Sequence, residues 1–125
     1  MTGRPRLGRD ARGSASVLVA GLIGVLVVLS GAALLVAGFA VAHHRARAAA
    51  DLAAVSGATV FGQGGDACQQ ARRSAQDNGA AVVGCEQVGD QIDYVVTVRV
   101  AVTVRTRVPG LPEQVEALAH AGPAR

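Results

Sequence analysis

The two cysteines, Cys68 and Cys85, are the residues of this chain best suited to covalent chemistry. An even pair in an oxidising compartment is typical of a disulfide, and a bridge across a loop of this size stabilises a small fold by about 3 kcal/mol in the chain-entropy estimate. Two buried free thiols are the alternative. Because no Cys-x-x-Cys motif or histidine pair at ligand spacing accompanies the cysteines, we expect neither zinc nor another cofactor.

The remaining residues of chemical interest form no recognisable catalytic pattern. His43 and His44 are adjacent, so on a helix their side chains diverge by about 100° and do not clamp one metal ion. His120 has no Ser, Cys or carboxylate pattern around it, and the glycine-rich residues 62–65 lack the lysine of a phosphate-binding loop. We therefore predict that the protein is not an enzyme and has no small-molecule substrate.

Residues 15–42 form a run of 28 residues without a charged side chain. About 20 apolar residues suffice to cross a bilayer as a helix, so this run predicts a transmembrane helix. A cleaved secretory signal is the alternative, because the alanines at 46, 48 and 50 fit a signal-peptidase site. We favour the anchor, since the apolar region of a signal is about 7 to 15 residues long.

Basic residues flank this span on both sides. Four arginines precede it within residues 1–14, and Arg45 and Arg47 follow it closely. Because the more basic flank stays in the cytoplasm, we expect a single-pass cell-membrane protein with a cytoplasmic N-terminus and an extracytoplasmic C-terminal part. The arginines that predict this topology are Arg4, Arg6, Arg9 and Arg12.

Glycines recur every seven residues within the span, at Gly24, Gly31 and Gly38. In lipid, small residues at such spacing let two helices approach closely. This glycine seam predicts packing against a second copy or another membrane subunit. The general abundance of Gly and Ala in the chain is the competing explanation.

Composition argues against a nucleic-acid partner. The chain has two Phe, one Tyr and no Trp, so it lacks aromatic platforms on which bases stack. Its net charge of +3 is concentrated beside the span, where membrane topology accounts for it. The partners that we expect are membrane lipid and other protein subunits.

The helix does not stop at the end of the span. Residues 43–61 are rich in Ala and free of Pro, and Leu52, Val55 and Thr59 fall at helical spacing, with Ala48 one turn earlier. A continuous helix of about 45 residues is predicted, starting near Ser14 or Ser16, of which the first part lies in lipid and the last part projects outward. The residues before the helix are expected to be a disordered leader.

Residues 62–125 predict a small extracytoplasmic domain. Glycines end the long helix, and Asp66 followed by Gln69 is the capping-box pattern of a short second helix. Residues 81–88 predict a strand that carries Cys85. From Ile92 to Val108, most apolar residues fall on one side of an extended chain and most polar residues on the other, which predicts a long strand with one buried face.

Two structures are compatible with the segment after that strand. Pro109 and Pro112 require a turn, and residues 114–121 then alternate as a strand that pairs back on the long one. A short helix beginning at Pro112 is the alternative, and we favour the strand. The predicted fold is α+β, with a leader (1–14), a transmembrane helix (15–42), a helical extension (43–61) and a domain (62–125) containing a short helix and an antiparallel sheet of two or three strands.

Three segments resemble a known family: RGSASVL at 12–18, RARAAADLAAVSGA at 45–58 and VEALAHAGP at 115–123. Together with the two cysteines, they are similar to the TadE/TadG-like pseudopilins of tight-adherence (Flp-type) pilus systems, in particular the actinobacterial helicase/secretion-neighbourhood TadE-like proteins. The resemblance implies a small membrane-anchored component of a pilus or secretion apparatus that works by association of its helix and domain.

Processed members of this family are cut after a Gly and carry Glu at the fifth mature position. The corresponding bond here joins Gly13 and Ser14, and Leu18 stands where the family has Glu. Two other functions compete with the family's function. One is a small secreted effector or binding protein released by cleavage near Ala48–Ala50, and the other is an accessory subunit of a membrane enzyme.

Overall fold

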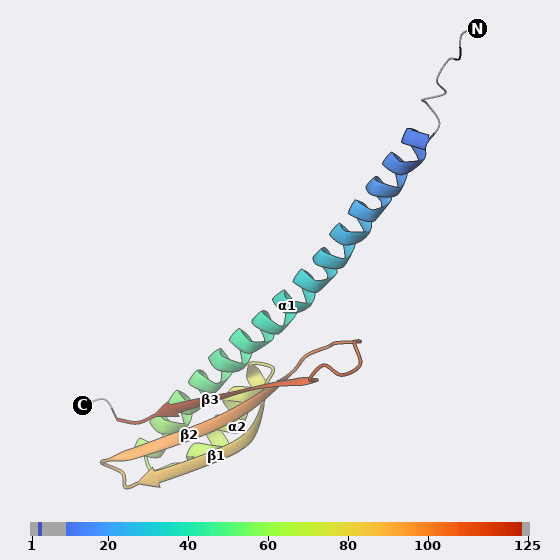
Figure 1. Ribbon diagram of the computed structural model, residues 1–125. Helices are drawn as coiled ribbons and strands as arrows, with labels where there is room; N and C mark the ends of the chain where they lie inside the picture. The colour runs from blue at the N-terminus through green and yellow to red at the C-terminus, as the bar shows by residue number, and fades with distance from the viewer. Residues whose placement is uncertain (1–2, 4–9, 124–125) are drawn as a thin grey trace. The chain divides into compact units, whose positions relative to one another are not determined.

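The computed structural model describes residue 3 and residues 10–123. It confirms the α+β fold: a long apolar helix is followed by a short helix and a three-stranded antiparallel sheet (Figure 1). The elements are α1 (Asp10–Gly62), α2 (Ala67–Asp77), β1 (Ala81–Gly89), β2 (Tyr94–Thr103) and β3 (Gln114–Ala121). The chain divides into two compact units, Met1–Ala37 and Gly38–Arg125, and α1 contributes to both.

Helix α1 begins at Asp10, earlier than the start expected at Ser14 or Ser16. The expectation of a disordered leader up to residue 14 is therefore wrong for its last residues. Ala and Arg have high helix propensities, so residues 11 and 12 allow the helix to begin before the serines. Arg4, Arg6 and Arg9, on which the predicted topology depends, lie outside the described residues.

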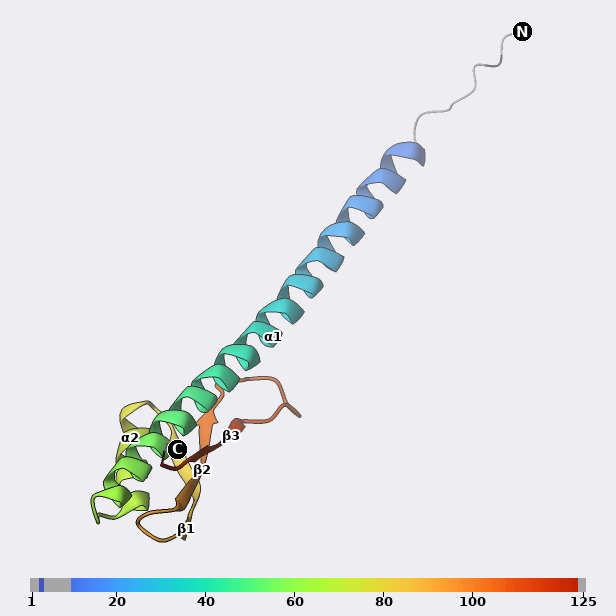
Figure 2. The same ribbon diagram turned by 90° about the vertical axis from the view of Figure 1, so that its left-hand side faces the viewer.

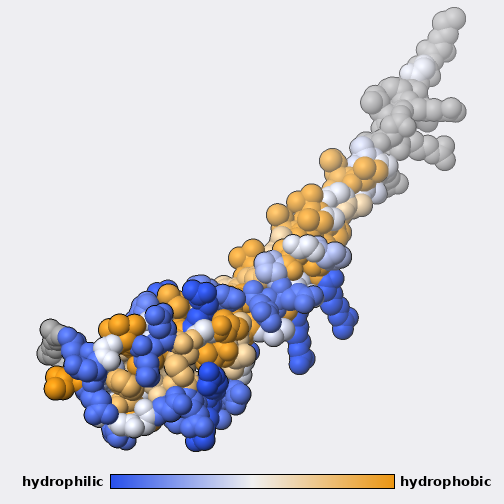
Figure 3. Space-filling model, turned by 90° about the horizontal axis from the view of Figure 1, so that it is seen from below, coloured by the Kyte–Doolittle hydropathy of each residue, from blue (hydrophilic) through white to orange (hydrophobic). Residues whose placement is uncertain are grey.

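In the first unit, α1 presents its apolar side chains to the surroundings. Its most apolar 18-residue stretch has a mean hydropathy of 2.7, and none of that stretch is buried inside the protein. Leu18 is 74% exposed and Leu34 is 75% exposed, whereas the core helix of a soluble domain would bury such residues. Figure 3 shows apolar side chains gathered along this part of α1. The helix is thus long and apolar enough to cross a membrane, a test that a signal sequence also passes.

In the second unit, the three strands run in the order β1-β2-β3 and pair antiparallel. Alternate residues of the central strand β2 are buried on one face, as its sequence pattern predicts: Tyr94, Val96, Val98, Val100 and Val102. The strand assignment for residues 114–121 is confirmed, since β3 pairs with β2 along its whole length. This pairing places Ala119 opposite Val98, where it is buried.

Strand β2 is shorter than the predicted strand from Ile92 to Val108. At its start, the backbone N–H of Ile92 donates to the carboxylate of Asp90, and Ile92 is 86% exposed instead of facing the core. At its end, the N–H of Thr106 bonds the carbonyl of Val104. These local hydrogen bonds occupy the backbone groups that a longer ladder would need.

The core of the second unit lies between the sheet and the two helices. The buried side chains of β2 pack with alanines of α1 and α2 in one cluster. Figure 2 shows α2 and the strands gathered around the last turns of α1. Gly57 of α1 lies so close to α2 that a Cβ there would be 2.8 Å from the carbonyl oxygen of Ala67. Small residues therefore bring both helices close to each other and to the sheet.

Candidate interaction surfaces

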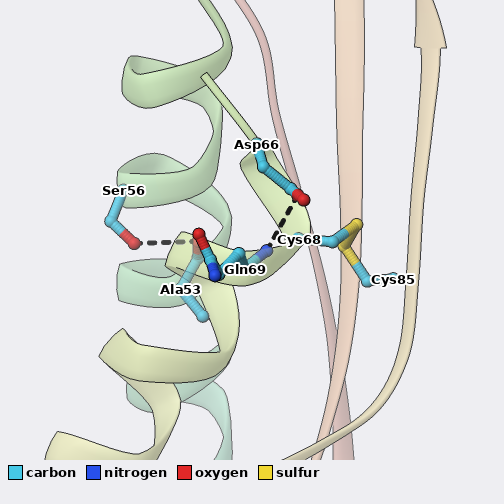
Figure 4. Close-up of a disulfide and its surroundings, with 6 residues drawn as sticks. All are labelled: Ala53, Ser56, Asp66, Cys68, Gln69 and Cys85. Atoms are coloured by element: carbon cyan, nitrogen blue, oxygen red, sulfur yellow. Dashed lines mark hydrogen bonds between the residues drawn. A yellow bond between two sulfur atoms is a disulfide. The ribbon is translucent and has the colours of Figure 1, made fainter.

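The two cysteines form a disulfide that joins α2 to β1 across a sequence separation of 17 (Figure 4). Asp66 caps the N-terminus of α2, where its side chain accepts a hydrogen bond of 3.0 Å from the backbone N–H of Gln69. This cap places Cys68 in the first turn of α2, facing β1. The predicted disulfide is thus present, and it staples the short helix to an edge strand of the sheet.

The three glycines of the seam, Gly24, Gly31 and Gly38, are exposed on α1. Among the residues that the structure describes, a Cβ added at any of them would meet no heavy atom within 4 Å. Packing within this chain therefore does not explain these glycines. The surface that they provide is open to another helix, as the seam hypothesis requires.

The stripe that made the second half of α1 recognisable as a helix is not the face that packs. Leu52 is 51% exposed and Val55 is 58% exposed. The face that packs on the sheet and on α2 consists of alanines with at most 7% exposure: Ala42, Ala46, Ala49, Ala50, Ala53, Ala54 and Ala58. An apolar surface formed by Leu52 and Val55 is thus left on the outside of the folded domain.

The two proposed cleavage regions lie in different surroundings. Gly13 and Ser14 are exposed residues in the first turns of α1. Ala49 and Ala50, by contrast, are helical and almost fully buried in the domain core. Cleavage near Ala48–Ala50 would also remove Ala46, which belongs to the same core.

The sheet face opposite the helices carries a shallow hollow of about 280 Å³. Glu86 of β1, Arg99 of β2 and Leu118 of β3 line it. Beside it, the hydroxyl of Thr97 lies 2.9 Å from Nδ1 of His120. No local pattern in the sequence indicates a partner for His120, because Thr97 and His120 are 23 positions apart and come together only through the pairing of β2 with β3.

This exposed face can bind by charge and hydrogen bonding. The guanidinium of Arg99 and the carboxylate of Glu86 offer donors and acceptors, and Leu118, 47% exposed, adds an apolar contact. Within residues 10–123, no three His, Cys, Asp or Glu side chains gather as a metal site requires.

In comparisons with known proteins, no family model, no curated protein and no solved structure matches this chain. Its function must therefore be inferred from its own residues and their arrangement.

Proposed function

We propose that this protein is a non-enzymatic, membrane-anchored component of a Tad/Flp-type pilus or secretion apparatus, similar to the TadE-like pseudopilins. Its apolar helix holds the protein in the cell membrane, with the N-terminus in the cytoplasm and the disulfide-stapled domain outside. It acts by association, through the glycine seam within the membrane and through its exposed domain surfaces outside it.

One observation carries the proposal: α1 supplies both the apolar stretch and part of the domain core. Ala42, the last residue of the uncharged run, and Ala46 are buried in the domain. A signal sequence is separated from the mature fold by an accessible cleavage site. Here the helix runs without a break from the apolar stretch into the core, which supports a permanent anchor.

Two exposed features support association with other subunits. The glycine seam leaves room for a close helix neighbour, and Leu52 and Val55 leave apolar surface uncovered after the domain has folded. In the sequence, Leu52 and Thr59 fall on the same seven-residue spacing as the glycines, with Arg45 standing between Gly38 and Leu52. A seven-residue repeat is the spacing at which two helices pack along a supercoil.

Intact-mass measurement on membrane and culture-fluid fractions of the native host tests the anchor. We expect the chain in the membrane, either complete or starting at Ser14, and a gain of two hydrogens on reduction of the disulfide. A chain in the culture fluid that starts near Ala49 or Asp51 would contradict the anchor and support the secreted protein.

Cross-linking in the native host tests the association. Gly31→Ile should lower the recovery of a cross-linked complex several-fold, because the larger side chain prevents close helix approach. Ala33→Ile is the matched control, since Ala33 is also exposed but lies on the opposite side of the helix, about 200° around from Gly31. Equal recovery from both variants would show that the seam has no role. Mass spectrometry of the complex then identifies its members, and a catalytic membrane protein instead of pilus or secretion subunits would favour an accessory enzyme subunit.

A further inference from the structure

A groove of about 490 Å³ lies in the second unit, between α1 and the end of β2. On one side, Val41, Ala42 and Arg45 of α1 line it. On the other side, it is lined by Val104 and Arg105, the first residues after β2. Segments about 60 residues apart in the sequence thus border one groove, and each contributes an arginine.

The two charged residues that line this groove, Arg45 and Arg105, are both basic, and the rest of its lining is uncharged. Arg45 and Arg105 are both exposed, and Arg47 and Arg107 follow them in the sequence and are exposed as well. Acidic residues also lie near these arginines. Asp51 stands one helical turn after Arg47, and the backbone carbonyl of Glu113 accepts a hydrogen bond from Val104 where the β2–β3 loop closes. A guanidinium offers paired N–H donors that match the oxygens of a phosphate group.

The groove lies where the uncharged run of the chain ends. Val41 and Ala42 are the last two residues of that run, and Arg45 is the first arginine after it. At this position a membrane-spanning helix leaves the hydrocarbon layer and enters the layer of lipid headgroups. The β2–β3 loop begins at this groove, since Val104 and Arg105 are the first residues after β2.

The tip of the β2–β3 loop has the composition expected of a segment that lies in the lipid-headgroup layer. Val108 is 43% exposed, and Leu111 is only partly buried. Between them, Pro109 and Gly110 carry no charge, so the tip presents apolar side chains next to the arginines. Apolar side chains beside basic ones are typical of segments that lie in the membrane interface.

We propose that this groove binds the phosphate group of an anionic phospholipid, and that the β2–β3 loop is a second membrane contact of the domain. Arg45 and Arg105 hold the phosphate from two sides, and Val108 and Leu111 enter the interface. The bound lipid would fix the domain close to the bilayer. This inference rests on the proposed membrane anchoring.

Hydrogen–deuterium exchange on the full chain in nanodiscs tests the inference. Discs of phosphatidylcholine are compared with discs that also contain phosphatidylglycerol. We expect the amides of residues 104–111 to exchange several-fold more slowly when phosphatidylglycerol is present. The double variant Arg45→Gln/Arg105→Gln should lose this difference, and Arg72→Gln/Arg73→Gln, which removes two exposed arginines of α2, should keep it.

Native mass spectrometry gives a second readout. Each arginine near an anionic lipid surface contributes about fivefold to binding, so the Arg45/Arg105 variant should lose most of the preference for phosphatidylglycerol over phosphatidylcholine.

The exchange experiment also contains a control for folding. Unchanged exchange of the β2 amides shows that the variant remains folded. Equal exchange of residues 104–111 in both discs would overturn the inference.

Further outcomes distinguish lipid phosphate from free phosphate as the ligand. They also distinguish failure of the lipid site from failure of the membrane anchor. If inorganic phosphate added to phosphatidylcholine discs protects the loop equally well, the groove is a site for free anions and the lipid proposal is wrong. If the chain fails to float with vesicles of either composition, the anchor itself fails and this inference fails with it. Flotation with both vesicles but no lipid-dependent protection overturns the inference and leaves the anchor standing.

Discussion

The hydroxyl of Tyr94 donates a hydrogen bond of 2.8 Å to the carbonyl oxygen of Ala58, 36 residues earlier in the chain. The Tyr94 ring also meets the ring of Phe61 edge-on, with centroids 4.9 Å apart. Tyr94 is the first residue of β2, and both of its partners lie near the end of α1. The start of the central strand is thereby attached to the last turns of the long helix.

Removal of this hydroxyl should weaken that attachment. We expect Tyr94→Phe to lower the free energy of unfolding by about 1 kcal/mol, since the ring contact is kept and one buried hydrogen bond is lost. Urea unfolding of the full chain in detergent micelles, followed by circular dichroism, measures the change. Phe61→Leu is the complementary variant, which keeps the hydrogen bond and removes the ring contact. An unfolding midpoint of Tyr94→Phe equal to that of the wild type would show that the hydrogen bond contributes nothing.

The disulfide between Cys68 and Cys85 should supply a large share of the stability of this small domain. Cys68→Ser/Cys85→Ser is expected to lower the free energy of unfolding by about 3 kcal/mol, because the unfolded chain regains the freedom of the loop. Reduction of the wild-type protein in the same micelles is the control and should give a loss of similar size. A double variant as stable as the oxidised wild type would contradict the role of the bridge as a staple.

An Ala→Leu substitution should lower the stability of the domain on the buried face of α1 and have little effect on the exposed face. Ala53 of α1 is fully buried in the domain core, so Ala53→Leu should destabilise the domain by about 1 to 3 kcal/mol through overpacking. Ala48→Leu, on the exposed face of the same helix, should change stability by less than about 0.5 kcal/mol. Thermal unfolding in micelles compares the melting temperatures of the two variants. Equal melting temperatures would show that the alanine face does not pack.

Asp90 organises the turn between β1 and β2. Its carboxylate accepts hydrogen bonds of 2.9 Å from the backbone N–H groups of Asp93 and Ile92, and these bonds lower the pKa of Asp90 below the usual value of about 3.9. A lowered pKa in the folded state means that the ionised carboxylate adds stability above the unfolded pKa. That contribution is lost as the pH falls through the folded pKa.

An NMR titration checks this behaviour. We expect the amide signals of Ile92 and Asp93 to shift together, with a midpoint below 3.9. In Asp90→Asn this titration should disappear while the turn is kept, because the side-chain oxygen of asparagine still accepts hydrogen bonds. A wild-type midpoint at or above the usual aspartate value would contradict the two hydrogen bonds.

Local signals in the sequence were sufficient for much of the fold. The uncharged run from 15 to 42 predicts an apolar helix by its length alone, and the glycines after Phe61 end the helix. Asp66 caps α2 as its spacing from Gln69 predicts. Alternation along β2 identifies its buried face, because successive side chains of a strand point to opposite sides.

Contacts between segments that are distant in the sequence decided which face of α1 packs and how β3 pairs. Periodicity drew attention to Leu52 and Val55, but the face that packs is built of alanines, because only small side chains let α1 approach the sheet and α2 so closely. The pairing of β2 with β3 selected a strand for residues 114–121 and brought Thr97 to His120.

The sequence by itself thus determined where the apolar helix lies and where it ends, where α2 begins, and which residues of β2 face inward, because each of these follows from neighbouring residues. The tertiary structure decided which face of α1 is buried, how the strands pair, and that Arg45 and Arg105 border one groove. These features depend on the volumes and hydrogen bonds of segments that meet only in the folded chain.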